Sequence, residues 1–115
     1  MTAPVIKRLH DALDACEAVL DFTSDAAFRE YEEDLMLRSA VERQLEVIGE
    51  ALGQAASEEA GLEREIPAIP RIVALRNRVI HGYDSVDDEI VWDIVQTNIP
   101  SLHRQLKRVL SEKGS

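Results

Sequence analysis

The chain has 115 residues, of which 45% are hydrophobic, 30% are charged and 4% are aromatic, and its formal net charge is −9 at pH 7. This is the length of one domain that can bury its own core, and no apolar run approaches the roughly 18 residues of a membrane span. The single cysteine, Cys16, excludes an intrachain disulfide and a cysteine-rich zinc site, and it favours a reducing, cytoplasmic setting.

Helical periodicity dominates the first half of the chain, and strand signals are nearly absent. Apolar residues at three- and four-residue spacing predict a first helix from about Pro4 to Phe22. A capping cluster at residues 23–25 follows it. A short helical turn and then one long helix from about Tyr31 to Ala60 are predicted next, with Gly61 as the C-terminal stop.

Two glycines, Gly49 and Gly53, lie four residues apart inside this long helix and therefore on one face. Each destabilises a helix interior by up to about 1 kcal/mol relative to alanine. Close approach of a second helix would compensate for this loss. We therefore expect a tight helix–helix contact along the face that carries both glycines.

A connector and a short third helix are predicted next. Pro67 and Pro70 exclude a helix interior, so residues 62–70 are predicted to form the connector. The third helix then runs from about Pro70 to Ile80. The sequence GYDSVDD, which follows it, is predicted to be a turn.

The last helix is long and contains Pro100, which is expected to kink it or split it. Residues 112–115 are predicted to be a frayed tail. Four main helices with short links are most simply arranged as an antiparallel, up-and-down bundle. The sequence therefore predicts an all-α fold with four main helices and one short extra helix.

The charges are distributed unevenly along the chain. Residues 66–83 and 94–111 contain no acid and carry +3 each, so the remaining residues carry −15. The overall charge argues against a nucleic-acid binder, because contacts with phosphates require clustered Lys and Arg. An acidic body with two basic stretches can still focus a positive potential on a phosphate site. Two ordinary solvated helix faces explain the same pattern equally well.

The first acid-free segment contains the sequence RNRVIHGY, residues 76–83. Arg76 offers a fixed fork of donors that matches phosphate, and histidine, as at His81, is the residue type suited to proton transfer near neutral pH. The two residues are about 140° apart around an ideal helix. A break in the helix or a second copy of the chain would have to bring them together. A surface arginine and a helix-terminal histidine often have this spacing, so it is a weak signal by itself.

The extended pattern is more specific. RNRVIHGY, followed by VDDEIVWDIVQTNIPSLHRQL and preceded by LRSAVERQLEVIGEAL, resembles the HepT branch of the HEPN superfamily, and the likeness runs from Ile6 to Leu110. The resemblance implies a single helical domain over residues 1–115, a homodimer, and a metal-independent endoribonuclease without a cofactor. It also implies the toxin of a type II- or type VII-like toxin–antitoxin pair, whose antitoxin is a minimal nucleotidyltransferase of the MntA type.

The resemblance assigns roles by position in the motif. Arg76 and His81 match the catalytic pair of that family, and Asn77 matches the polar residue that accompanies them. Arg78 follows directly, and with Asn77 it is expected to position the substrate. Tyr83 matches the tyrosine that the antitoxin modifies with AMP, which silences the toxin.

The chemistry of RNA cleavage agrees with these residue types. RNA supplies its own nucleophile, the 2′-OH, so cleavage requires a base, an acid for the leaving 5′-oxygen and positive charge at the phosphate. We expect two copies of His81 in one homodimer cleft to act as base and acid, with both copies of Arg76 holding the scissile phosphate. Glu46 and Glu50 also match the family pattern, but neither is assigned a catalytic role.

Two other functions agree with the same sequence. A non-catalytic, homodimeric helical module would use the same residues to bind a nucleotide or a protein partner, and the negative net charge favours this alternative. A plain dimeric scaffold also suits four helices with apolar faces. No metal site is predicted, because His10 and His103 lie on separate helices without ligand spacing. Neither a membrane nor DNA is expected as a partner.

Overall fold

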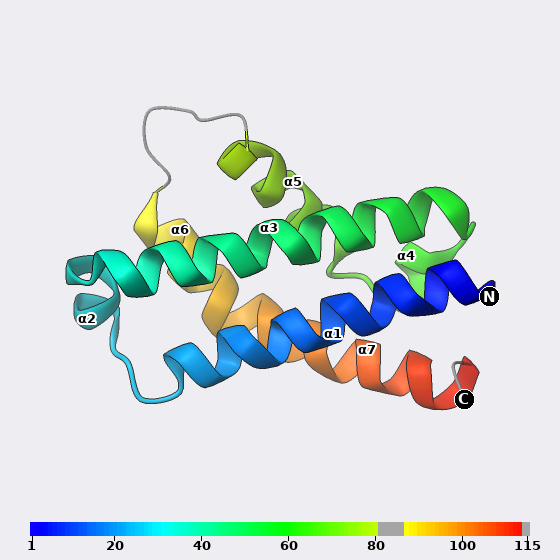
Figure 1. Cartoon of the computed structure of the whole chain (residues 1–115), viewed down its shortest axis with the longest axis horizontal. Helices are drawn as coiled ribbons and strands as arrows, with labels where there is room; N and C mark the ends of the chain where they lie inside the picture. The colour runs from blue at the N-terminus through cyan, green and yellow to red at the C-terminus, as the bar shows by residue number, and fades with distance from the viewer. Residues whose placement is uncertain (81–86, 114–115) are drawn as a thin grey trace.

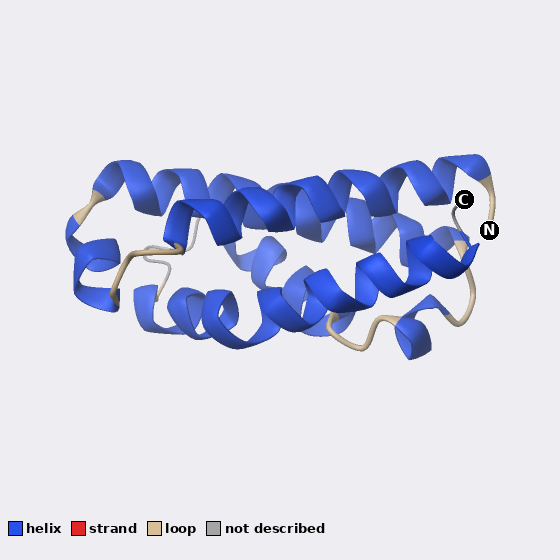
Figure 2. Ribbon diagram, turned by 90° about the horizontal axis from the view of Figure 1, so that it is seen from below, coloured by secondary structure: helices blue, strands red, loops and turns tan. Residues whose placement is uncertain are grey.

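The computed structural model of the chain describes residues 1–80 and 87–113. These two ranges contain helices and no strand (Figure 2). The long helices run alternately in opposite directions and form an antiparallel bundle (Figure 1). They are α1 (Ala3–Thr23), α3 (Leu35–Glu58), α5 (Ile69–Ile80) and α7 (Ile99–Lys113). The shorter elements are α2 (Phe28–Glu33), α4 (Leu62–Glu65), α6 (Asp88–Asp93) and a π-helical segment, η1 (Ile94–Asn98). The predicted all-α bundle is confirmed, with more short helices than the single one expected.

The first helix, α1, packs against both α3 and α7. Its buried side chains recur at three- and four-residue spacing, which is why the periodicity predicted it within one residue at each end. The Thr2 hydroxyl caps the helix by accepting a hydrogen bond from the backbone N–H of Val5. Cys16 is fully buried in the core, and this burial raises the pKa of its thiol to about 12. Its predicted role as a small core residue is confirmed.

The predicted break between a short helical turn and one long helix lies at Asp34. The backbone of Asp34 is extended, so α2 ends there. Its carboxylate accepts a hydrogen bond from the backbone N–H of Leu37 at 3.1 Å and starts α3. The prediction placed Tyr31 in the long helix, whereas it belongs to α2, where its buried ring lies 5.2 Å from the ring of Trp92.

The connector predicted for residues 62–70 contains a helical turn of its own, α4. Gly61 precedes this turn with a φ of 84°, in the left-handed region that favours glycine. The predicted stop of the long helix at Gly61 is wrong, because α3 ends at Glu58 with Glu59 as its cap, and Gly61 caps the start of α4 instead. The next helix, α5, begins at Ile69, so Pro70 lies in its first turn, where a backbone N–H is not needed for the hydrogen bonds of the helix. The predicted third helix is therefore confirmed to within one residue.

The irregularity expected near Pro100 takes the form of η1, directly before α7. The backbone N–H of Ile99 donates to the carbonyl of Ile94, five residues earlier, which is the hydrogen bond of a π-helix. At the other end, α7 continues to Lys113, whose ammonium pairs with the Glu65 carboxylate. The helix thus includes the first two residues of the predicted tail, and residues 114 and 115 lie outside the described ranges. Within these ranges, every helix is too short or too polar to cross a membrane.

Candidate active site

The described part of the predicted site lies on the last two turns of α5. This helix packs against α3, and its Ile72 and Leu75 are buried. Arg76 follows one turn after Ile72 and is half-buried, whereas Asn77 and Arg78 are exposed. The other predicted site residues, His81 and Tyr83, lie outside the described residues.

Arg76 contacts two neighbours through its guanidinium group. Its Nη1 donates a hydrogen bond to Oδ1 of Asn77 at 3.0 Å, and its Nη2 lies 4.0 Å from Oε2 of Glu50 on α3. Its Nε is buried and has no hydrogen-bond partner among the described residues. The terminal Nη groups of a guanidinium are suited to bind the oxygens of a phosphate. Asn77 therefore lies within hydrogen-bond distance of the Arg76 guanidinium.

The aliphatic part of Arg76 crosses α3 at Gly49. A Cβ atom built on Gly49 would lie 2.2 Å from Cβ and 2.7 Å from Cγ of Arg76. The close helix approach predicted from the two glycines is therefore confirmed at Gly49. At Gly53 an added Cβ would lie 3.8 Å from Val73, at ordinary van der Waals distance, so the contact with α5 there does not require a glycine.

The two glutamates that match the family pattern have different neighbours. Glu46 pairs with Arg43 on its own helix at 3.2 Å. Glu50 lies near the Arg76 guanidinium, which the sequence analysis missed. The available signal was its position directly after Gly49, because the residue after a close helix contact lies beside the neighbouring helix.

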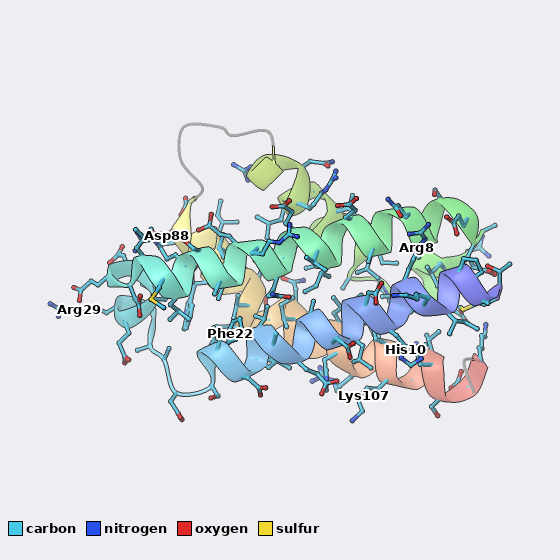
Figure 3. All side chains as sticks on the ribbon, in the orientation of Figure 1. Arg8, His10, Phe22, Arg29, Asp88 and Lys107 are labelled. Carbon is cyan, nitrogen blue, oxygen red and sulfur yellow. The ribbon has the colours of Figure 1, made fainter. Side chains whose placement is uncertain are left out.

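A groove of about 440 Å³ is lined by residues of α1 and α3, and Arg8 lies in it between these two helices (Figure 3). The charged side chains that line it are Arg8, Arg43, Asp11, Asp14 and Glu50. Carboxylates outnumber guanidinium groups in this set, so the groove is poorly suited to the phosphates of RNA.

Within residues 1–80 and 87–113, no group of three or more His, Cys, Asp and Glu side chains is arranged to hold a metal ion. His10 lies on α1 and His103 on α7. The described part of the candidate site consists of Arg76, Asn77 and Arg78 on α5, with Gly49 and Glu50 of α3 beside Arg76.

Comparison with known proteins assigns the family. The family model described as ribonuclease HepT-like matches residues 12–109, a range that includes the whole RNRVIHGY motif. The chain belongs to the HepT-like ribonuclease family. The resemblance drawn from the motif and its flanking sequences is thus confirmed, and so is the predicted class of enzyme, a ribonuclease.

Several relatives of this HepT-like chain are similar over nearly their whole length. A protein of Thermococcus cleftensis named "Probable ribonuclease HepT" is 33% identical over 101 residues, which cover 88% of this chain and 91% of that protein. Two proteins whose names describe them as predicted RNases are also similar. One, from Methanocaldococcus jannaschii, is 33% identical over 103 residues, which cover 88% of this chain and 92% of that protein. The other, from Caldanaerobacter subterraneus, is 30% identical over 105 residues, which cover 91% of this chain and 93% of that protein. No solved structure matches the chain.

Proposed function

We propose that this HepT-like chain is a metal-independent endoribonuclease that works as a homodimer through Arg76 and His81. The family match over residues 12–109 carries the proposal, because it spans the complete Arg-x4-His motif. The ribonuclease name of the Thermococcus cleftensis relative supports the same activity. The half-buried Arg76 supports a role in binding phosphate, because its Nη groups carry N–H donors that match phosphate oxygens.

In the proposed reaction, the 2′-OH of the RNA attacks the adjacent phosphorus while the bond from phosphorus to the 5′-oxygen breaks. His81 of one protomer accepts the proton of the 2′-OH, and His81 of its partner donates a proton to the leaving 5′-oxygen. Arg76 stabilises the charge that develops on the phosphate oxygens. Asn77 holds one end of the guanidinium, and the exposed Arg78 attracts the neighbouring backbone. The products end in a 2′,3′-cyclic phosphate and a 5′-OH.

The test is cleavage of RNA by the purified protein in the presence of EDTA. We expect products with 2′,3′-cyclic phosphate ends, and we expect His81→Ala and Arg76→Ala to slow cleavage by about 100-fold or more. Arg29→Ala is the control, because Arg29 is an exposed arginine on α2 that pairs with Glu33 one turn later on the same helix (Figure 3). Cleavage by His81→Ala at the wild-type rate, or cleavage that requires Mg²⁺, would contradict the proposal.

We also propose that the chain is a toxin controlled through Tyr83. An MntA-type nucleotidyltransferase would attach AMP to the tyrosine hydroxyl and release pyrophosphate from ATP. The added phosphodiester would place a negative charge two residues from His81 and would compete with RNA for Arg76. Intact-mass measurement after incubation with such an antitoxin and ATP should show AMP adducts on wild type and none on Tyr83→Phe. Unmodified wild-type protein would contradict this part.

The net charge of −9 favours the alternative, a non-catalytic module that binds a nucleotide or a protein partner. Salt separates the two functions. Cleavage that depends on phosphate contacts should weaken steeply as ionic strength rises, because counterions compete for the basic groups. RNA that stays intact at every ionic strength would favour the non-catalytic module.

A further inference from the structure

We infer that Gly49 is a positioning residue for Arg76: its missing side chain lets the arginine stem lie directly on α3, and this contact fixes where the guanidinium group emerges. The inference rests on the proposed nuclease function for its consequence in catalysis, but the contact itself concerns only α3 and α5. Neither residue belongs to the segment outside the described ranges.

The distances at Gly49 leave no space for a side chain. An added Cβ would lie 2.2 Å from Cβ and 2.7 Å from Cγ of Arg76, and 3.3 Å from the carbonyl oxygen of Ile72. The first two distances are far below van der Waals contact, and the atoms concerned lie at the root of the Arg76 side chain. They cannot rotate away as the tip of a flexible chain does, so α5 or the whole arginine has to move.

The position of the root determines the position of the guanidinium. Arg76 lies one turn after Ile72, on the face of α5 that meets α3, and its head group ends beside Glu50 and Asn77. A displacement of roughly 1 Å at a group that stabilises a transition state is enough to reduce a rate by about 100-fold. Gly49 therefore acts through Arg76 without touching RNA itself.

Gly53 provides a matched control on the same helix. It lies one turn after Gly49 and faces the same helix, but an added Cβ there would lie 3.8 and 3.9 Å from the two methyl groups of Val73, at ordinary contact distance. Gly49→Ala and Gly53→Ala make the same chemical change and gain the same helix propensity. Any difference between them reports the contact with Arg76.

The first arm of the test measures stability and does not depend on activity. We expect Gly49→Ala to lower Tm by about 4 °C or more, and Gly53→Ala to leave it unchanged or raise it. Arg76→Gly removes the Cβ and Cγ atoms that conflict with the new side chain, so in that background Gly49→Ala should no longer lower Tm. If Gly49→Ala alone does not fold, the double variant must fold. Equal effects of Gly49→Ala in both backgrounds overturn the inference.

The second arm measures RNA cleavage by the folded variants. We expect Gly49→Ala to reduce the turnover of wild type by about tenfold or more, and Gly53→Ala to stay within about twofold of it. In the Arg76→Lys background, Gly49→Ala should change turnover by less than about twofold, because the fork that it misplaces is already absent. Equal losses in both backgrounds, or equal turnover of the two alanine variants, overturn the inference.

The two proposals fail in different ways. Wild-type protein that leaves RNA intact contradicts the nuclease function, and the stability arm then decides the contact between Gly49 and Arg76 alone. Wild-type protein that cleaves RNA, together with an unaffected Gly49→Ala variant, contradicts only the positioning role.

Discussion

The guanidinium group of Arg76 has two neighbours of different strength. The amide oxygen of Asn77 accepts a hydrogen bond at 3.0 Å, whereas the Glu50 carboxylate lies 4.0 Å away and is 53% exposed. An ion pair this exposed contributes at most about 1 kcal/mol, so an incoming phosphate can replace it. Asn77 therefore orients Arg76, and Glu50 partly balances its charge.

A second side chain, Glu42, gives a testable dependence on pH. Burial and the nearby Asp88 carboxylate raise the pKa of Glu42, and Arg38 partly opposes them. A raised pKa in the folded state means that the fold favours the protonated form of Glu42. Protonated Glu42 therefore stabilises the folded state below the ordinary pKa of 4.5, and this contribution is lost as pH rises through the raised pKa. Glu42→Gln is neutral at every pH. We therefore expect it to have a slightly higher Tm than wild type at neutral pH and no advantage below the ordinary pKa.

Thermal unfolding followed by circular dichroism at both pH values measures this difference. Glu46→Gln, one turn later on α3, is the control. It loses the ion pair with Arg43, so it should gain no stability at neutral pH. A Glu42→Gln variant that melts at or below the wild-type temperature at neutral pH contradicts the prediction.

At the scale of the elements, the sequence predicts the long helices well and the short ones poorly. The apolar periodicity of α1 and the proline in the first turn of α5 are local signals. The predicted bounds of these two helices therefore agree with the observed ones within one residue. The end of α2 is set instead by the single cap at Asp34 and by the packing of Tyr31 on Trp92. That contact joins residues far apart in the sequence, so periodicity cannot reveal it.

The cap at the start of α3 gives the second prediction. Asp34→Ala removes the acceptor for the Leu37 N–H, so we expect a loss of about 1 kcal/mol in the free energy of unfolding. Asp34→Asn keeps an acceptor of the same shape and should lose much less. Urea unfolding at neutral pH measures both values. Equal stability of the alanine and asparagine variants would show that the cap does not hold this helix start.

At the scale of the whole molecule, the motif and the helix order were predictable, but the contacts of the site were not. The spacing of Gly49 and Gly53 places both on one face of α3 and predicts a tight contact at both. The position of α5 along the axis of α3 decides that Gly49 contacts Arg76 and that Glu50 lies beside the Arg76 guanidinium. The position of α5 along α3 depends on the packing of side chains along both helices, and no local sequence pattern predicts it.

The proposed dimer gives the third prediction. If two copies of His81 share one cleft, a mixed dimer of wild-type and His81→Ala chains lacks either the base or the acid. Adding an excess of His81→Ala protein under conditions of subunit exchange should therefore lower the activity per wild-type chain by about tenfold or more. Arg29→Ala protein, added in the same excess, should leave it unchanged. Undiminished activity per wild-type chain would show that each protomer carries a complete site.

The placement of the chain ends has a practical consequence. α1 begins and α7 finishes at the same end of the bundle, whereas α5 runs away from that end towards Arg76 (Figure 1). An affinity handle fused to either terminus therefore projects away from the arginine. Protein anchored to a surface through such a handle keeps the end of α5 that carries Arg76 away from that surface.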